Sequence, residues 1–167
     1  TINGWVDTSA LWGPALPGPF AAPGEPILFQ DNFETDTSAN WNVFAGSPSG
    51  VEDYTIDWAF DYSTSHYVSD GVTNTIPSAP NSSGASRGVK MTVNHNDEVE
   101  ETAAVNIYPK DQTFSGDFAL RFDMWINYNG PAGGGTGSTE HGIFGINHIG
   151  DKVNWHAATS SDGLLVG

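Results

Sequence analysis

An apolar side chain stands at every second position through residues 54–62 and again through residues 118–128. Successive side chains of a β-strand point to opposite faces, so this period of two predicts strands at both places. No segment of the chain shows a convincing helical period of 3.6 residues. The 20 glycines and 10 prolines among 167 residues exceed the usual share and indicate many turns. Together these features predict an all-β domain.

Shorter strands are predicted where β-branched and aromatic residues gather between turn residues. The expected ranges are 27–33, 41–44, 89–95, 103–107, 143–148 and 152–157, with a hairpin turn at 149–151 between the last two. Two stretches rich in small, polar and Gly residues, 63–87 and 129–140, are predicted to be long loops. The alternation predicts burial for Ile56, Phe60, Leu120, Phe122 and either Met124 or Trp125.

Both ends of the chain differ in character from its middle. Residues 1–26 contain two Pro- and Gly-rich stretches and are predicted to be an extended N-terminal segment or linker. Its large apolar side chains, such as Trp5 and Trp12, are expected to dock on a neighbouring surface. The domain proper spans 27–167, and its final apolar run at 164–167 resembles a strand that has just begun. We therefore expect the domain to be incomplete at its C-terminus.

The charge of the chain narrows the classes of partner. Lys and Arg total 5 and Asp and Glu total 20, which gives a net charge of -15. Such an acidic surface repels phosphate backbones, so nucleic-acid binding is not expected. No apolar run approaches the roughly 20 residues that a membrane-spanning helix needs, so membrane insertion is not expected either. Calcium, cationic partners and neutral sugars remain compatible with this charge.

Several short motifs recur together in one family of domains. The most informative is the run from Gln30 to Trp41, QDNFETDTSANW. Five further pieces fit the same pattern: residues 76–82, 87–91, 114–118, 122–127 and 135–140. Over residues 27–167 the chain resembles the concanavalin A-like lectin/glucanase (laminin G-like) jelly-roll domains of large bacterial secreted or surface proteins. It departs from their usual opening at Asn32, where the family carries a second acid.

This resemblance implies an antiparallel two-sheet jelly-roll sandwich of the concanavalin A-like type. It also implies an extracellular or cell-surface location on a bacterium, as one module of a larger protein. The fold alone does not determine a function, because the same sandwich carries lectins, enzymes and structural modules. Any function must therefore be inferred from particular residues.

Glycoside hydrolysis would require two carboxylates facing each other across a cleft, about 5–9 Å apart. The glucanases of this fold place their acids in a Glu-x-Asp-x-x-Glu pattern. The acidic run at Glu98, Glu100 and Glu101 lacks the central Asp and the following acid, and residues 52–57 fail in the same way. We therefore predict that the chain is not an enzyme, and we interpret both runs as solvated turns and strand ends.

Sugar binding is the second candidate chemistry. Lectin-like sites stack exposed aromatic rings on sugars and surround them with Asn, Asp and Gly. The candidate aromatics are Trp58, Tyr62, Tyr67, Trp125, Tyr128 and Trp155, and the predicted carbohydrate-binding residues are Trp125, Asn127, Tyr128 and Trp155. Trp125 is the strongest candidate of these, because it falls on the polar face of its predicted strand. A Trp packed beneath a neighbouring segment is the alternative interpretation of the same position.

Calcium is the one cofactor that the sequence suggests. Asp31, Glu34 and Asp36 supply hard oxygen ligands within one predicted turn. The alternative is that these side chains only bond to the backbone of the turn. The five histidines are scattered and do not predict a transition-metal site.

Taken together, the sequence predicts a non-enzymatic β-sandwich module of the cell surface that serves structure, adhesion or glycan binding. Its partners would be glycans or other surface-protein subunits. Two more specific alternatives are a carbohydrate-binding module attached to a glycan-degrading enzyme and an assembly subunit of a surface layer or filament. The second alternative includes homo-oligomers and assemblies in which subunits share strands.

Overall fold

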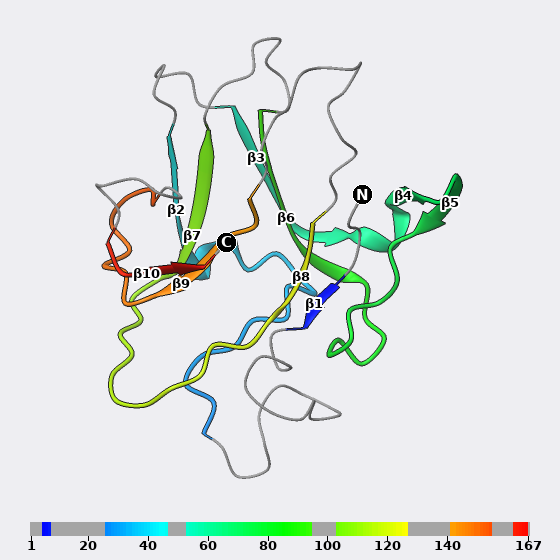
Figure 1. The fold of residues 1–167 in the computed structure, drawn as a ribbon. Helices are drawn as coiled ribbons and strands as arrows, with labels where there is room; N and C mark the ends of the chain where they lie inside the picture. Colours follow the sequence, from blue (N-terminus) through cyan, green and yellow to red (C-terminus); the bar gives the residue numbers. More distant parts are fainter. Residues whose placement is uncertain are drawn as a thin grey trace. The chain divides into compact units, whose positions relative to one another are not determined.

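The computed structural model describes residues 5–7, 26–46, 53–94, 103–126, 141–154 and 162–166 (Figure 1). In these residues the chain is all-β, with only single-turn 3-10 helices beside the strands. The strands are β1 (Trp5–Asp7), β2 (Trp41–Gly46), β3 (Tyr54–Asp61), β4 (His66–Ser69), β5 (Val72–Thr75), β6 (Arg87–Val93), β7 (Ala104–Pro109), β8 (Asp123–Trp125), β9 (Phe144–Ile146) and β10 (Leu164–Val166). The 3-10 turns are η2 (Ser38–Asn40) and η3 (Tyr62–Thr64). No helix in the described ranges is long and apolar enough to cross a membrane.

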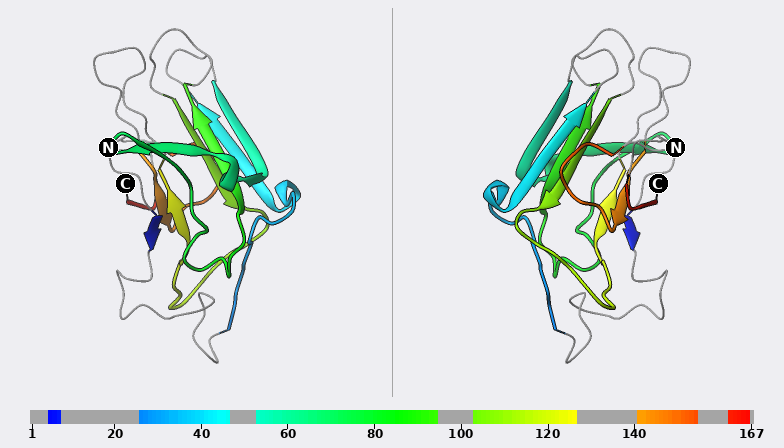
Figure 2. Two further views of the ribbon diagram at one scale, coloured as in Figure 1. Left: turned by 90° about the vertical axis from the view of Figure 1, so that its right-hand side faces the viewer. Right: turned by 90° about the vertical axis from the view of Figure 1, so that its left-hand side faces the viewer.

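The described strands form five small sheets of two strands each: β1–β8, β2–β7, β3–β6, β4–β5 and β9–β10. Antiparallel register is established for four of the pairs, and β2–β7 is the longest of these, with Trp41 opposite Pro109 and Gly46 opposite Ala104. This pair can be followed in both views of Figure 2. Antiparallel pairing satisfies the backbone groups of short strands, which suits a chain so rich in turn residues.

The chain divides into two compact units, which are described separately below. Unit 1 contains Thr1–Thr35, Phe60–Gly88 and Phe114–Glu140, and unit 2 contains Asp36–Ala59, Val89–Thr113 and His141–Gly167. The predicted N-terminal segment, residues 1–26, lies outside the described residues except for β1 and Pro26. In unit 1, β1 pairs with β8, so that Trp5 stands opposite Trp125 in the backbone register.

Several predicted strands are confirmed. The expected strands at 41–44, 54–62, 89–95 and 103–107 correspond to β2, β3, β6 and β7, and the apolar run at 164–167 contains β10. The alternation through 54–62 is nevertheless interrupted, because Ala59 has a φ of 59°. A residue in the left-handed region bends the strand, so its side chains do not alternate regularly from Tyr54 to Tyr62.

The strand predicted at 27–33 is wrong, because this segment has no strand structure. The side chains of Asp31 and Asn32 accept hydrogen bonds from the backbone N–H groups of Phe33 and Glu34, at 2.9 and 3.1 Å. These local bonds form a turn and replace the bonds of a sheet. Ile27, in the same segment, is 59% exposed.

The longest predicted strand, 118–128, is also largely wrong. Only Asp123–Trp125 forms a strand, and residues 127–128 lie outside the described residues. Phe118 instead packs its ring against Phe114, with centroids 5.8 Å apart, and Leu120 is 44% exposed. Alternation along a sequence produces a strand only where a partner strand is present, and here β1 supplies one for three residues.

The predicted hairpin of 143–148 with 152–157 differs from the structure as well. Strand β9 pairs with β10, with Phe144 opposite Val166, and residues 152–154 are not a strand. Asn154 is instead held by side-chain hydrogen bonds, described below. Residues 155–157 lie outside the described residues.

The loop predicted over 63–87 contains a β-hairpin, β4–β5, which is drawn in green in Figure 1. Its two-residue turn is Asp70-Gly71, with φ angles of 51° and 76°. Positive φ at both positions is the type I′ arrangement, whose twist matches that of the paired strands. The Asp-Gly pair therefore indicates a hairpin, although the polar composition of the whole segment indicates a loop.

Among the described residues, the buried large hydrophobic side chains are Tyr62 and Ile76, at 8% and 5% exposure. Both belong to unit 1. The residues predicted to be buried, such as Ile56, Phe60 and Phe122, are half-buried instead, and Leu120 is exposed. Two-stranded sheets cover their side chains only partly, which explains this difference.

Candidate functional site

One face of β8 in unit 1 brings together aromatic and polar side chains. Asp123 and Trp125 are two residues apart in a strand and so point to the same side. The ring of Trp125 lies against that of Tyr67, with centroids 5.0 Å apart and planes inclined at 60°. Asp123 accepts two hydrogen bonds from Asn81, from the backbone N–H to Oδ2 and from Nδ2 to Oδ1, each 2.9 Å long. We call these four residues the β8 site; all of them are half-buried.

The β4–β5 hairpin positions Tyr67. Tyr67 stands opposite Asn74 in the register, so these two side chains share one face of the hairpin, and both are half-buried. His66 and Val68 point to the other face and are exposed. The hairpin therefore directs Tyr67 toward Trp125, which belongs to the same unit.

The turn that follows positions Asn81, and Tyr62 holds that turn together. The buried phenol of Tyr62 donates to the carbonyl oxygen of Ala85 at 2.8 Å and accepts from the N–H of Ala79 at 3.1 Å. The Ser82 hydroxyl lies 2.8 and 2.9 Å from the carbonyl oxygens of the same two alanines. These bonds fix both ends of the turn, so Asn81 meets Asp123 from a rigid backbone.

Asp61 anchors the residues on either side of this turn. Its Oδ1 accepts hydrogen bonds from Ser63 Oγ at 2.6 Å, from Ser63 N–H at 3.1 Å and from Ser86 Oγ at 3.0 Å. The bonds from the Ser63 and Ser86 hydroxyls lower the pKa of Asp61, because they favour the ionised carboxylate. Hydrogen bonds thus join Asp61, at the end of β3, to Ser63 in η3 and to Ser86, just before β6.

Of the four predicted carbohydrate-binding residues, the structure describes Trp125; Asn127, Tyr128 and Trp155 lie outside the described residues. Of the other candidate aromatics, Tyr67 packs against Trp125, whereas Tyr62 is buried and Trp58 packs against Trp41. The structure adds Asp123 and Asn81 to Trp125 and Tyr67. The position of Asp123, two residues before Trp125, was readable from the alternation, whereas no sequence signal linked Asn81 to β8.

The residues predicted to bind calcium make local hydrogen bonds. Asp31 caps the N–H of Phe33 at 2.9 Å, and Asp36 accepts from the N–H of Ser38 at the same distance. The Ser38 bonds lower the pKa of Asp36. Glu34 belongs with Asp31 to unit 1, whereas Asp36 belongs to unit 2. In the described parts of the chain, no three His, Asp or Glu side chains are grouped so as to hold a metal ion; calcium binding stays a prediction.

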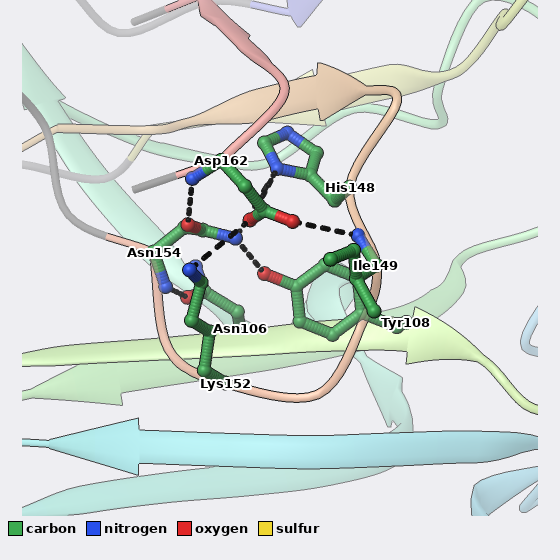
Figure 3. A network of polar contacts seen from close by, with 7 residues as sticks. All are labelled: Asn106, Tyr108, His148, Ile149, Lys152, Asn154 and Asp162. Carbon is green, nitrogen blue, oxygen red and sulfur yellow. Dashed lines mark hydrogen bonds and ion pairs between the residues drawn. The ribbon is translucent and has the colours of Figure 1, made fainter. Parts of the chain in front are cut away.

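A second cluster of polar side chains lies in unit 2 and centres on Asn154, which is 1% exposed (Figure 3). Its backbone N–H donates to Asn106 Oδ1 at 2.6 Å. Its Nδ2 donates to the phenol oxygen of Tyr108 at 2.8 Å and lies 3.2 Å from His148 Nδ1. Its Oδ1 accepts from the N–H of Asp162 at 3.0 Å. Asn154, which lies after β9, therefore joins β7 to Asp162, two residues before β10.

Asp162 completes this Asn154 network. Its carboxylate accepts from the N–H of Ile149 at 2.8 Å and lies 3.5 Å from His148 Nδ1 and 4.0 Å from Lys152 Nζ. The bond from Ile149 is the main cause that lowers the pKa of Asp162 to about 2. The pKa of the Tyr108 phenol is raised, and burial of the side chain is the main cause.

Within the Asn154 network, His148 packs closely against the backbone of β9. The side chain of His148 is 7% exposed, and its buried Nε2 has no hydrogen-bond partner among the described residues. A Cβ placed on Gly145 would collide with this nitrogen and with the carbonyl oxygen of Leu164. The imidazole of His148 therefore lies directly against the backbone of Gly145. The acids of the predicted non-catalytic run at 98–101 lie outside the described residues.

Comparison of the chain with protein-family models, with curated proteins and with solved structures gave no significant match.

Proposed function

We propose that this chain is a non-enzymatic, glycan-binding module, and that the β8 site is where the glycan binds. The observation that carries the proposal is the juxtaposition on one face of the Trp125–Tyr67 ring pair and the Asp123–Asn81 polar pair. Sugars present both kinds of surface. Their C–H faces pack on aromatic rings, and their hydroxyls bond to carboxylates and amides.

The hydrogen bonding of the Asp123–Asn81 pair supports this function. Each oxygen of Asp123 accepts one hydrogen bond from Asn81, and a carboxylate oxygen can accept two. Acceptor capacity for sugar hydroxyls therefore remains on both oxygens. The bonds from Asn81 also fix the rotamer of Asp123, which reduces the entropy that binding would otherwise cost.

The net charge of -15 favours the same class of ligand. It opposes binding to phosphate backbones and anionic lipid surfaces, and it does not oppose binding to uncharged sugars. We further propose that the small antiparallel sheets belong to a two-sheet jelly-roll sandwich of the concanavalin A-like type. On this proposal the module works outside the cell or at its surface.

A second candidate is an assembly subunit, and β10 is the observation that favours it. Leu164 and Val166 on this strand are 57% and 44% exposed, and within the described residues β10 has one strand partner, β9. An open strand with exposed apolar side chains is the kind of surface that pairs with a strand of another subunit. Light scattering of the purified chain over a range of concentrations separates this candidate, which requires oligomers, from a monomeric binding module.

The experiment that tests the proposed function is binding to a panel of immobilised neutral glycans, comparing the native chain with Trp125→Ala. Retention of at least one neutral glycan, lost at least tenfold in the variant, is the expected result. Trp41→Ala is the matched control, since Trp41 belongs to unit 2 and packs against Trp58 at 6.2 Å. Equal retention of Trp125→Ala and the native chain would refute the β8 site as the place of binding. Release of reducing sugar from any retained glycan would refute the non-enzymatic part.

A further inference from the structure

We infer that Asp123 makes the β8 site selective by charge, so that it accepts neutral and amino sugars and rejects uronic acids and other anionic sugars. This inference deepens the proposed function and rests on it. It follows from where the carboxylate lies. Asp123 is on the same face of β8 as Trp125, so a sugar stacked on the ring would place its substituents beside the carboxylate.

The hydrogen bonds at Asp123 leave its charge in place. Within the described part of the chain, both of its hydrogen bonds come from Asn81, whose backbone N–H and amide are neutral donors. A neutral donor polarises the carboxylate but does not cancel its charge. Acidic residues also outnumber Arg and Lys in unit 1, so the unit as a whole carries a negative charge.

The size of the effect follows from Coulomb's law. Two unit charges about 5 Å apart change an equilibrium constant by about fourfold in surroundings like bulk water, and by more where the local dielectric constant is lower. A sugar carboxylate beside Asp123 should therefore bind at least about fourfold more weakly than its neutral counterpart. A protonated amino group in the same place should bind at least as well as the neutral sugar.

The test uses pairs of polymers with a common backbone and different charge. Hydroxyethylcellulose is compared with carboxymethylcellulose, dextran with carboxymethyl dextran, and chitosan serves as the cationic polymer. Binding is measured by affinity electrophoresis at low and at high salt. We expect the native chain to prefer each neutral polymer over its anionic partner by at least about fourfold at low salt, with a smaller preference at high salt.

Asp123→Asn is the informative variant, because it removes the charge and keeps the shape. Asn81 can turn its amide to present Oδ1 to the new NH₂ group, so the pair stays hydrogen-bonded. We expect this variant to lose most of the preference for neutral polymers. Asp117→Asn is the matched control: it removes one charge from an exposed position of the same unit and should leave the preference unchanged.

The possible failures are distinguishable. Equal binding of the neutral and anionic polymers by the native chain, with binding still dependent on Trp125, overturns the inference and leaves the glycan site standing. An equal loss of preference in both Asn variants also overturns it, because the effect would then come from net charge and not from the site. If none of the polymers binds and the panel of neutral glycans is not retained either, the proposed function fails and this inference fails with it.

Discussion

Replacing Asn154 with Ala should destabilise the protein by about 3–4 kcal/mol. The side chain is 1% exposed and makes three polar contacts, with the N–H of Asp162, the phenol of Tyr108 and Nδ1 of His148. A lost hydrogen bond costs about 1 kcal/mol, and each buried group left without a partner raises the cost toward 1–3 kcal/mol. Asp162 is partly exposed and can bond to water instead, so the total stays below the sum of the maximal penalties.

The backbone bond from residue 154 to Asn106 does not depend on the side chain, so Asn154→Ala isolates the amide. Equilibrium urea unfolding, followed by tryptophan fluorescence and by far-UV circular dichroism, measures the change. Asn32→Ala is the control, because this exposed amide makes a single bond to the N–H of Glu34 at 3.1 Å and should cost under about 0.5 kcal/mol. If the two variants unfold at the same urea concentration, the Asn154 network does not hold unit 2 together as described.

Gly145→Ala should destabilise the protein by about 1–3 kcal/mol in thermal unfolding, because the new Cβ would overlap the imidazole of His148 and the backbone of Leu164. Gly88→Ala should be nearly neutral, because its Cβ would meet the Tyr62 ring at an ordinary 3.6 Å. The pKa of Asp162 is lowered to about 2, below the ordinary 3.8, so its contribution to stability is complete above about pH 4 and is lost as the pH falls toward 2. Unfolding midpoints measured across this range should decline in the native chain and decline less in Asp162→Asn. An equal decline in both would contradict this prediction. Tyr62→Phe removes the phenol that joins Ala79 and Ala85, so hydrogen exchange in the turn between them should accelerate at least tenfold, and unchanged protection would contradict the role given to this residue.

The period-two pattern predicted the fold class well and the extent of individual strands unevenly. It succeeded at β2, β3, β6 and β7, where the alternating residues have a partner strand. It failed over 118–122, where the pattern continues but no partner is present among the described residues. Strand pairing is a long-range property, and a local pattern cannot supply it.

Local chemistry competed with the pattern at two other places. At 27–33 the side chains of Asp31 and Asn32 satisfy neighbouring N–H groups and form a turn in place of a strand. At 63–87 the polar composition predicted a loop, while the Asp70-Gly71 pair formed the hairpin that carries Tyr67. Turn residues with specific backbone requirements were more informative here than average composition.

The candidate site was predictable only in part. Trp125 could be identified from its place on the polar face of an alternating segment, and Asp123 shares that face. Tyr67 and Asn81 come from segments about 40 to 60 residues away in the chain, and only the folded structure shows that they meet β8. The contacts of Asn154 with Asn106 and Tyr108 have the same long-range character.

The measurement that tests the central claim most directly is the tryptophan indole region of a ¹H–¹⁵N NMR spectrum, recorded while a glycan retained in the panel is added. The chain has six tryptophans, and assignment by single Trp→Phe variants identifies each indole signal. Our account predicts that the Trp125 signal shifts and saturates with the glycan, while the signals of Trp41 and Trp58 in unit 2 stay in place. Saturable shifts at Trp41 and Trp58 without a shift at Trp125 would contradict the assignment of glycan binding to the β8 site.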